Sequence, residues 1–211
     1  GTFYHDALNN FARLARRDKA YPDISDEKLQ SMTEEAMQPL VEEMLAGPMG
    51  DGERNLARFE LAKNAIHRAG EVITRQLKAG SFRIEQTEIG FGCEHGLPPI
   101  VLVLPDGREV MLRGRIDRVD RYDHEDSTYL RVIDYKSSHQ DLEATRTWWR
   151  LQLQLLLYLD VCTSAMPAAK PAGAFYFYVD DPLVETTADA AHVVEKQMRK
   201  IFRLKGITLY D

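Results

Sequence analysis

Cysteine is scarce in this chain, which has only two, Cys93 and Cys162, among 211 residues. Two cysteines so far apart cannot supply a four-ligand zinc site, and they do not make the disulfide framework of a small secreted domain. We therefore expect two reduced thiols in a cytoplasmic protein.

Several other features are missing as well. No stretch approaches the roughly 18 uninterrupted apolar residues of a membrane-spanning helix, and no signal peptide opens the chain, so we expect no membrane association. No Gly-x-Ser-x-Gly motif occurs, which argues against a serine hydrolase. No internal repeat or low-complexity tract is found. The first residue is Gly1 and not methionine, and we expect a domain excised from a larger subunit.

The composition is that of a globular protein, with 44% hydrophobic and 28% charged residues. The net charge of −6 argues mildly against a protein that coats nucleic acid. Basic residues nevertheless gather locally. One such cluster contains Arg113, Arg115, Arg118 and Arg121. Most of these clusters are expected to be solvated surfaces, and one or two could follow a DNA backbone.

Apolar periodicity predicts helices first and strands afterwards. Helices are expected at 1–18, 26–46 and 54–79, with Pro39 kinking or splitting the second. Strands are expected at 83–91, 100–104, 109–118, 130–136 and 174–180, and further helices at 141–164 and 186–204. An Asp-Gly turn at 106–107 predicts a hairpin, and the strands from 83 to 136 are expected to form one antiparallel set. Strands alternating with long helices indicate an α/β layered domain over 1–211, helical to about 80 and sheet-based from about 81.

The segment 112–138 contains the most informative pattern. Asp134 and Lys136 are two residues apart on a predicted strand, so their side chains project from the same face. Asp117 ends the apolar core of the strand before it. Burying an acid and an amine on a sheet face is costly unless they are compensated, and a divalent cation held by two carboxylates would compensate them. The alternative is an ordinary surface ion pair, which an isolated Asp-x-Lys usually makes.

Four motifs together resemble those of the PD-(D/E)XK nucleases, in their RecB-like branch. They are Gly1-x-x-x-His5, Gly114-x-x-Asp117, Asp134-Tyr135-Lys136 and Gln154-x-x-x-Tyr158. The similarity extends along the whole chain, is strong at 112–138 and 170–182, and is weak at 20–80. It implies an α/β fold with a central mixed or antiparallel sheet flanked by helices and an added N-terminal helical region.

The resemblance also implies roles for individual residues. Asp117, Asp134, the Tyr135 main-chain carbonyl and His5 would bind a metal, while Lys136 would orient or deprotonate the attacking water. Gln154 and Tyr158 would position Lys136 and the nucleophile, or contact DNA. Glu88, in a Glu-x-x-Phe-Gly pattern, is a further candidate for the site, with a surface carboxylate as the alternative.

The implied activity is hydrolysis of DNA with Mg²⁺ as the metal and Mn²⁺ as an acceptable substitute. The implied partners are single-stranded DNA ends and the helicase–nuclease subunit of a complex that processes double-strand breaks. Many such subunits carry an iron–sulfur cluster, but neither Cys93 nor Cys162 lies where its ligands would be, so no cluster is expected within this chain. Two alternatives stay open: a non-catalytic scaffold that binds DNA or a partner, and a stand-alone CRISPR-associated RecB-like nuclease.

Overall fold

The computed structural model describes residues 2–46, 53–136, 144–179 and 204–208. The chain forms two compact units, each assembled from several segments. The first unit contains the helices before Ser81 together with the last residues of two strands, from Tyr135 and from Phe177 onward. The second contains most of the β-structure and one long helix. The helix predicted at 186–204 lies outside the described residues.

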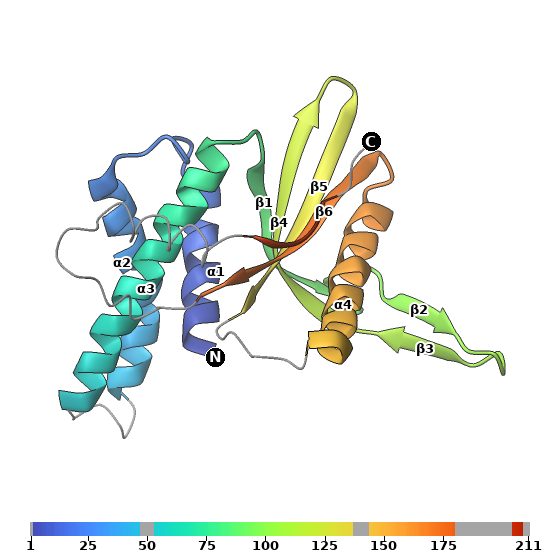
Figure 1. Ribbon diagram of the computed structural model, residues 1–211, viewed down its shortest axis with the longest axis horizontal. Coiled ribbons are helices and arrows are strands. Elements are labelled where there is room, and N and C mark those ends of the chain that lie inside the picture. Colours follow the sequence, from blue (N-terminus) through green and yellow to red (C-terminus); the bar gives the residue numbers. More distant parts are fainter. Residues whose placement is uncertain (1, 47–52, 137–143, 180–203, 209–211) are drawn as a thin grey trace. The chain divides into compact units, whose positions relative to one another are not determined.

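The described part of the first unit consists mainly of three helices that pack along one another (Figure 1): α1 (Thr2–Arg17), α2 (Asp26–Ala46) and α3 (Glu53–Lys78). Their apolar stripes form the core predicted from the periodicity. The buried side chains include Leu8, Phe11, Met32, Met37, Ile66 and Ile73.

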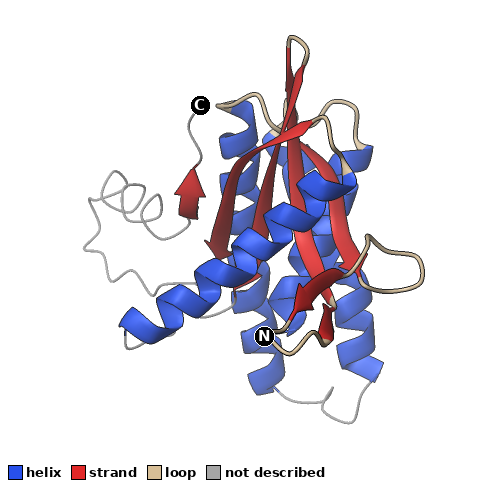
Figure 2. Ribbon diagram, turned by 90° about the vertical axis from the view of Figure 1, so that its right-hand side faces the viewer, coloured by secondary structure: helices blue, strands red, loops and turns tan. Residues whose placement is uncertain are grey.

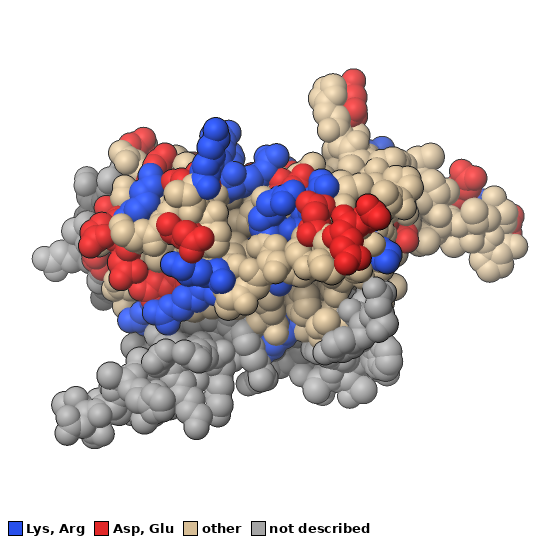
Figure 3. Space-filling view, turned by 90° about the horizontal axis from the view of Figure 1, so that it is seen from above, with Lys and Arg blue, Asp and Glu red and all other residues tan. Residues whose placement is uncertain are grey.

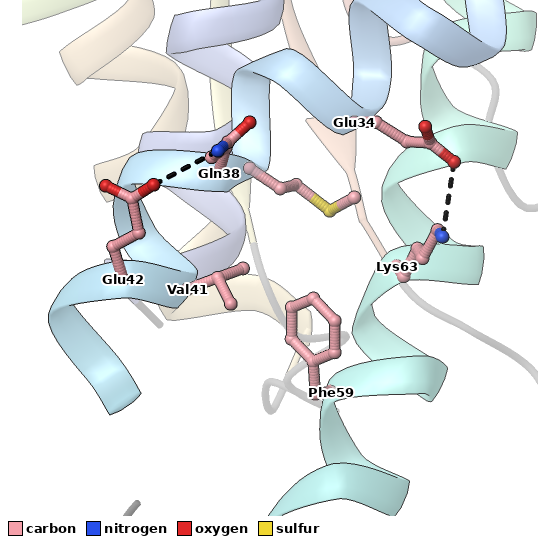
Figure 4. A pocket seen from close by; sticks show the side chains of 7 residues that line it. Glu34, Gln38, Val41, Glu42, Phe59 and Lys63 are labelled. Atoms are coloured by element: carbon pink, nitrogen blue, oxygen red, sulfur yellow. Dashed lines mark hydrogen bonds and ion pairs between the residues drawn. The ribbon is translucent and has the colours of Figure 1, made fainter. Parts of the chain in front are cut away.

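The second helix continues through Pro39, so the expected split does not occur. Met37 before the proline and Val41 after it both line a pocket of about 320 Å³ together with Phe59 of α3. Figure 4 shows Val41 facing Phe59 across this pocket, with the Glu34–Lys63 ion pair of 3.2 Å beside it. Because α2 packs against α3 on both sides of Pro39, the loss of one backbone hydrogen bond does not end the helix.

In the described parts of the chain, the main sheet has five strands in the order β1-β4-β5-β6-β7. These are β1 (Arg83–Phe91), β4 (Gly114–His124), β5 (Ser127–Lys136), β6 (Ala169–Tyr178) and β7 (Lys205–Thr208). The pairs β1–β4, β4–β5 and β6–β7 are antiparallel. Strands β5 and β6 are neighbours connected through α4 (Ala144–Ala165), which crosses one face of the sheet (Figure 2). The α/β class predicted from the sequence is confirmed.

Strands β2 (Ile100–Val103) and β3 (Glu109–Leu112) form a separate two-stranded sheet that extends away from the rest of the second unit (Figure 1). The Asp-Gly turn is confirmed, with Gly107 at φ 82°. The prediction of one antiparallel set with a single strand over 109–118 was wrong, because the chain leaves β3 and starts β4 at Gly114. A Cβ at Gly114 would lie 2.6 Å from the Phe91 ring, so this glycine lets β4 pack against β1 at the junction.

The β2–β3 ribbon exposes apolar side chains on both faces. Val103 and Met111 on one face are 69% and 59% exposed, and Leu102 on the other is 42% exposed. Among the described residues no helix is long and apolar enough to cross a bilayer. The two cysteines are free thiols, Cys93 at the surface and Cys162 buried.

Candidate metal-dependent active site

Two buried carboxylates lie on the neighbouring strands β4 and β5. The antiparallel pairs of β4 and β5 extend as far as Arg118 with Ile133, and Asp117 and Asp134 are the next residues of the two strands. Continued by one residue, this register would set the two acids on one face of the sheet. Each aspartate is only 4% exposed. The sheet therefore holds two acids side by side in a setting where uncompensated charge is costly.

Lys136 follows Asp134 on the same strand, and alternate residues of a strand project to the same side. Its side chain is half-buried. The Val179 amide donates a hydrogen bond of 2.8 Å to the Lys136 carbonyl, which fixes the end of β5 against the residue that follows β6. The predicted Asp-x-Lys arrangement is thus carried on a regular strand.

Glu88 lies in line with the two aspartates. The β1–β4 register pairs Thr87 with Arg118 and Ile89 with Ile116, which leaves Glu88 opposite Asp117. Its backbone has φ 53°, a left-handed conformation that is uncommon for a residue with a side chain and that concentrates at functional sites. The carboxylate is directed to Arg115, with Oε1 3.4 Å from Nη1.

His5 packs against the residue whose carbonyl was predicted to bind the metal. Its ring lies 6.2 Å from the Tyr135 ring at 83°, and the Tyr135 ring makes a second edge contact with Phe177. The amide Nδ2 of buried Asn9, one helical turn later, lies 3.2 Å from His5 Nδ1. Sequence reasoning missed Asn9, although its i, i+4 spacing from His5 was the available signal.

Gln154 and Tyr158 act together on α4. The Gln154 amide donates a hydrogen bond of 2.7 Å to the Tyr158 hydroxyl, which confirms that the two side chains share one surface. The Tyr158 ring packs edge-on against Phe91 at 5.7 Å. Phe91 pairs with Gly114, three residues before Asp117, so α4 is anchored at the start of the strand that carries the first aspartate.

A buried ionic cluster stiffens β4 beyond Asp117. Both Arg118 and Asp120 are fully buried and form two hydrogen bonds of 2.7 and 2.9 Å, and Arg131 adds a third contact to Asp120 of 2.8 Å. Burial lowers the pKa of Arg131, with Asp120 opposing that effect. The sequence had placed Arg118 in a basic cluster, but the structure shows that it is part of the core.

The candidate ligands Asp117 and Asp134 offer carboxylate oxygens, which suit Mg²⁺ better than a transition metal that is bound by four or more side chains. Magnesium keeps several waters and is commonly bound by one or two carboxylates, which Asp117 and Asp134 can supply. Within the described part of the chain, no group of three or more His, Cys, Asp or Glu side chains is arranged to hold a metal. Glu88 and His5 are thus not gathered with the aspartates into such a group.

The surface charge is mixed. On the face seen in Figure 3, lysine and arginine side chains are interspersed with aspartate and glutamate. A broad basic surface is therefore not visible on that face, and phosphate recognition would depend on individual basic side chains.

Comparison with known proteins decides the family. The family model described as the PD-(D/E)XK nuclease superfamily matches residues 1–205. The chain belongs to this superfamily. The family expected from the four sequence motifs is thereby confirmed. The role of each candidate site residue stays a prediction.

Curated relatives of this member of the superfamily are each described as one subunit of an "ATP-dependent helicase/deoxyribonuclease". The proteins from Alkaliphilus oremlandii and Clostridium tetani are 35% identical over 217 residues and 34% over 218. The protein from Bacillus thuringiensis is 35% identical over 225 residues. Each match covers all of this chain and 19% of the relative, so the chain spans about a fifth of the length of these relatives.

Proposed function

We propose that this chain is a Mg²⁺-dependent deoxyribonuclease that hydrolyses phosphodiester bonds in single-stranded DNA. The observation that carries the proposal is the burial of Asp117 and Asp134 next to the Arg118–Ile133 pair of β4 and β5, with Lys136 two residues after Asp134. Membership in the PD-(D/E)XK superfamily supports the same reaction class.

Asp117 and Asp134 would hold the metal, together with the Tyr135 main-chain carbonyl and His5, and water would complete the coordination. When bound, Mg²⁺ supplies Lewis-acid chemistry that activates water and offsets the charge on the phosphoryl group. The packing of His5 against Tyr135 supports a shared task for these two residues. Glu88 would be an outer member of the carboxylate row.

Lys136 would bring a compact positive charge to the reaction. Its Nζ would orient the attacking water, take part in removing its proton, and stabilise the phosphoryl oxygens. Gln154 and Tyr158, joined by their hydrogen bond, would orient Lys136 and the nucleophile or contact the DNA.

The matched relatives are helicase/deoxyribonuclease subunits of the AddB (RexB) type, and we place this chain as the nuclease domain of such a subunit. In that setting it would work beside the AddA helicase–nuclease subunit in the cytoplasm. The complex would trim DNA ends at double-strand breaks before recombinational repair.

The test is cleavage of labelled single-stranded DNA by the wild-type chain, Asp134→Ala and Lys136→Ala, with Mg²⁺ or with EDTA. Wild type should cut only with Mg²⁺, and each substitution should slow cleavage by about 100-fold or more. Equal cleavage by all three proteins would refute the assignment.

A second candidate is a non-catalytic scaffold that binds DNA or a partner subunit. It is favoured by the absence, within the described residues, of a group of three or more acidic or other potential ligands arranged around one point. DNA binding by the wild-type chain without any Mg²⁺-dependent cleavage would support this role.

A further inference from the structure

Arg115 stands beside the proposed metal ligands. It lies on β4 two residues before Asp117, so its side chain leaves the same face of the strand about 7 Å away. Its side chain is 66% exposed. The arginine cluster recognised in the sequence is thereby divided, because Arg118 is buried against Asp120 and Arg121 is hydrogen-bonded to Asp123.

The surroundings of Arg115 leave its guanidinium accessible. The residue opposite it on β1 is Gly90, which has no side chain to cover it. The ion pair with Glu88 is 3.4 Å long, at the upper end of hydrogen-bond distances, and it is exposed on the Arg115 side. Such pairs contribute little to stability, so exchanging the carboxylate for another anion costs little.

We propose that Arg115 binds a phosphate of single-stranded DNA next to the phosphate being cleaved, and that Glu88 holds the guanidinium in place until DNA displaces it. The inference rests on the proposed function, because that function assigns DNA to this face. A guanidinium presents two parallel N–H donors that match two phosphate oxygens, which makes arginine well suited to this task.

The arrangement has two opposite consequences for DNA affinity. Removing Arg115 takes away a phosphate contact. Neutralising Glu88 removes the competitor for the guanidinium and a negative charge that repels phosphate, so DNA binding should tighten. Glu88→Gln keeps the size of the side chain and changes its charge alone.

The experiment measures binding of a fluorescent oligothymidylate by anisotropy in EDTA, so that no cleavage takes place, over a series of salt concentrations. Arg115→Ala should weaken binding by about tenfold, the value of one charge-assisted hydrogen-bond contact. It should also reduce the slope of log affinity against log salt by about 0.7, as expected for one phosphate contact with a single strand. Glu88→Gln should tighten binding, and this gain should be clearly smaller in the Arg115→Ala background, where only the relief of charge repulsion is left.

Arg83→Ala is the matched control. Arg83 has a 60% exposed side chain and an ion pair with Asp123 of 2.8 Å, and it lies at the other end of β1. The Arg83→Ala variant removes the same charge at a comparable exposure. Its DNA affinity and its salt slope should therefore stay close to those of wild type. A melting curve for each variant confirms that it is folded.

Equal affinity and equal salt slope for Arg115→Ala and Arg83→Ala would overturn the inference, even if Asp134→Ala abolishes cleavage. Conversely, if the wild-type chain does not cleave DNA but Arg115→Ala still lowers its DNA affinity, the nuclease assignment is refuted. The phosphate contact of Arg115 is then retained. The two proposals can therefore fail separately.

Discussion

Asp117 of β4 and Asp134 of β5 both adjoin the last antiparallel pair of these strands, Arg118 with Ile133, and both are buried. Two carboxylates in this relationship repel each other, and a bound cation relieves the repulsion. The structural relationship therefore leads directly to a prediction about metal binding.

Asp117→Asn should weaken Mn²⁺ binding by about tenfold or more, because it removes one of two charged oxygen ligands. Binding can be measured by electron paramagnetic resonance of free Mn²⁺ during a titration. The control is Asp160→Asn, an exposed acid on α4 that should not alter the affinity. Unchanged binding in Asp117→Asn would place the metal elsewhere.

Tyr158→Phe should reduce the rate of DNA cleavage without unfolding the protein. The change deletes the hydroxyl that accepts the Gln154 hydrogen bond but keeps the ring against Phe91. The expected cost in free energy of unfolding is about 1 kcal/mol. Single-turnover cleavage and urea unfolding, measured on the same samples, separate the two effects. Tyr158→Ala, which also loses the Phe91 contact, should be the less stable of the two variants.

Asp120→Asn should destabilise the protein by about 3–5 kcal/mol, because Arg118 and Arg131 would remain buried around a neutral group. Urea unfolding gives this value. Asp123→Asn, at an exposed ion pair with Arg121, provides the comparison and should have a much smaller effect. Similar losses in both variants would contradict the proposed importance of burial.

Burial raises the pKa of the Cys162 thiol to about 12. The folded protein therefore binds this proton more tightly than the unfolded chain. The stabilisation is complete below the ordinary thiol pKa of about 8.5 and is lost as pH rises from there toward 12. Cys162→Val should flatten the fall of unfolding free energy over this alkaline range. At neutral pH, Ellman's reagent should modify exposed Cys93 and spare Cys162, and equal modification of both would contradict the burial.

The sequence was sufficient for the elements that carry the site. Alternating apolar residues defined β1 and β5, and the i, i+4 spacing placed Gln154 and Tyr158 on one surface. It was insufficient at the junction of β3 and β4, because the apolar residues Val110, Leu112 and Ile116 keep one parity across the point where the two strands separate. The break depends on the packing of Phe91 against Gly114, which is a contact between distant parts of the chain.

The charged residues of β4 made its burial unpredictable from the sequence. The middle of this strand, residues 116–120, is buried on both faces. Its side chains include Arg118 and Asp120, so the hydrophobic pattern understates the burial. Only the pairing of β4 with β5 shows that Arg131 completes the charge balance. The family follows from the comparisons, while the roles of His5, Glu88, Lys136 and Tyr135 stay predictions.

The β2–β3 ribbon has a practical consequence for binding and cleavage measurements. Two strands with open edges and apolar side chains such as Val103 and Met111 on display can add strands from a neighbouring molecule. Self-association by edge pairing would make the measured affinities depend on the protein concentration. Dilution series, and a lysine introduced at Val103 to repel a second ribbon, would keep the solution monomeric while leaving β4 and β5 untouched.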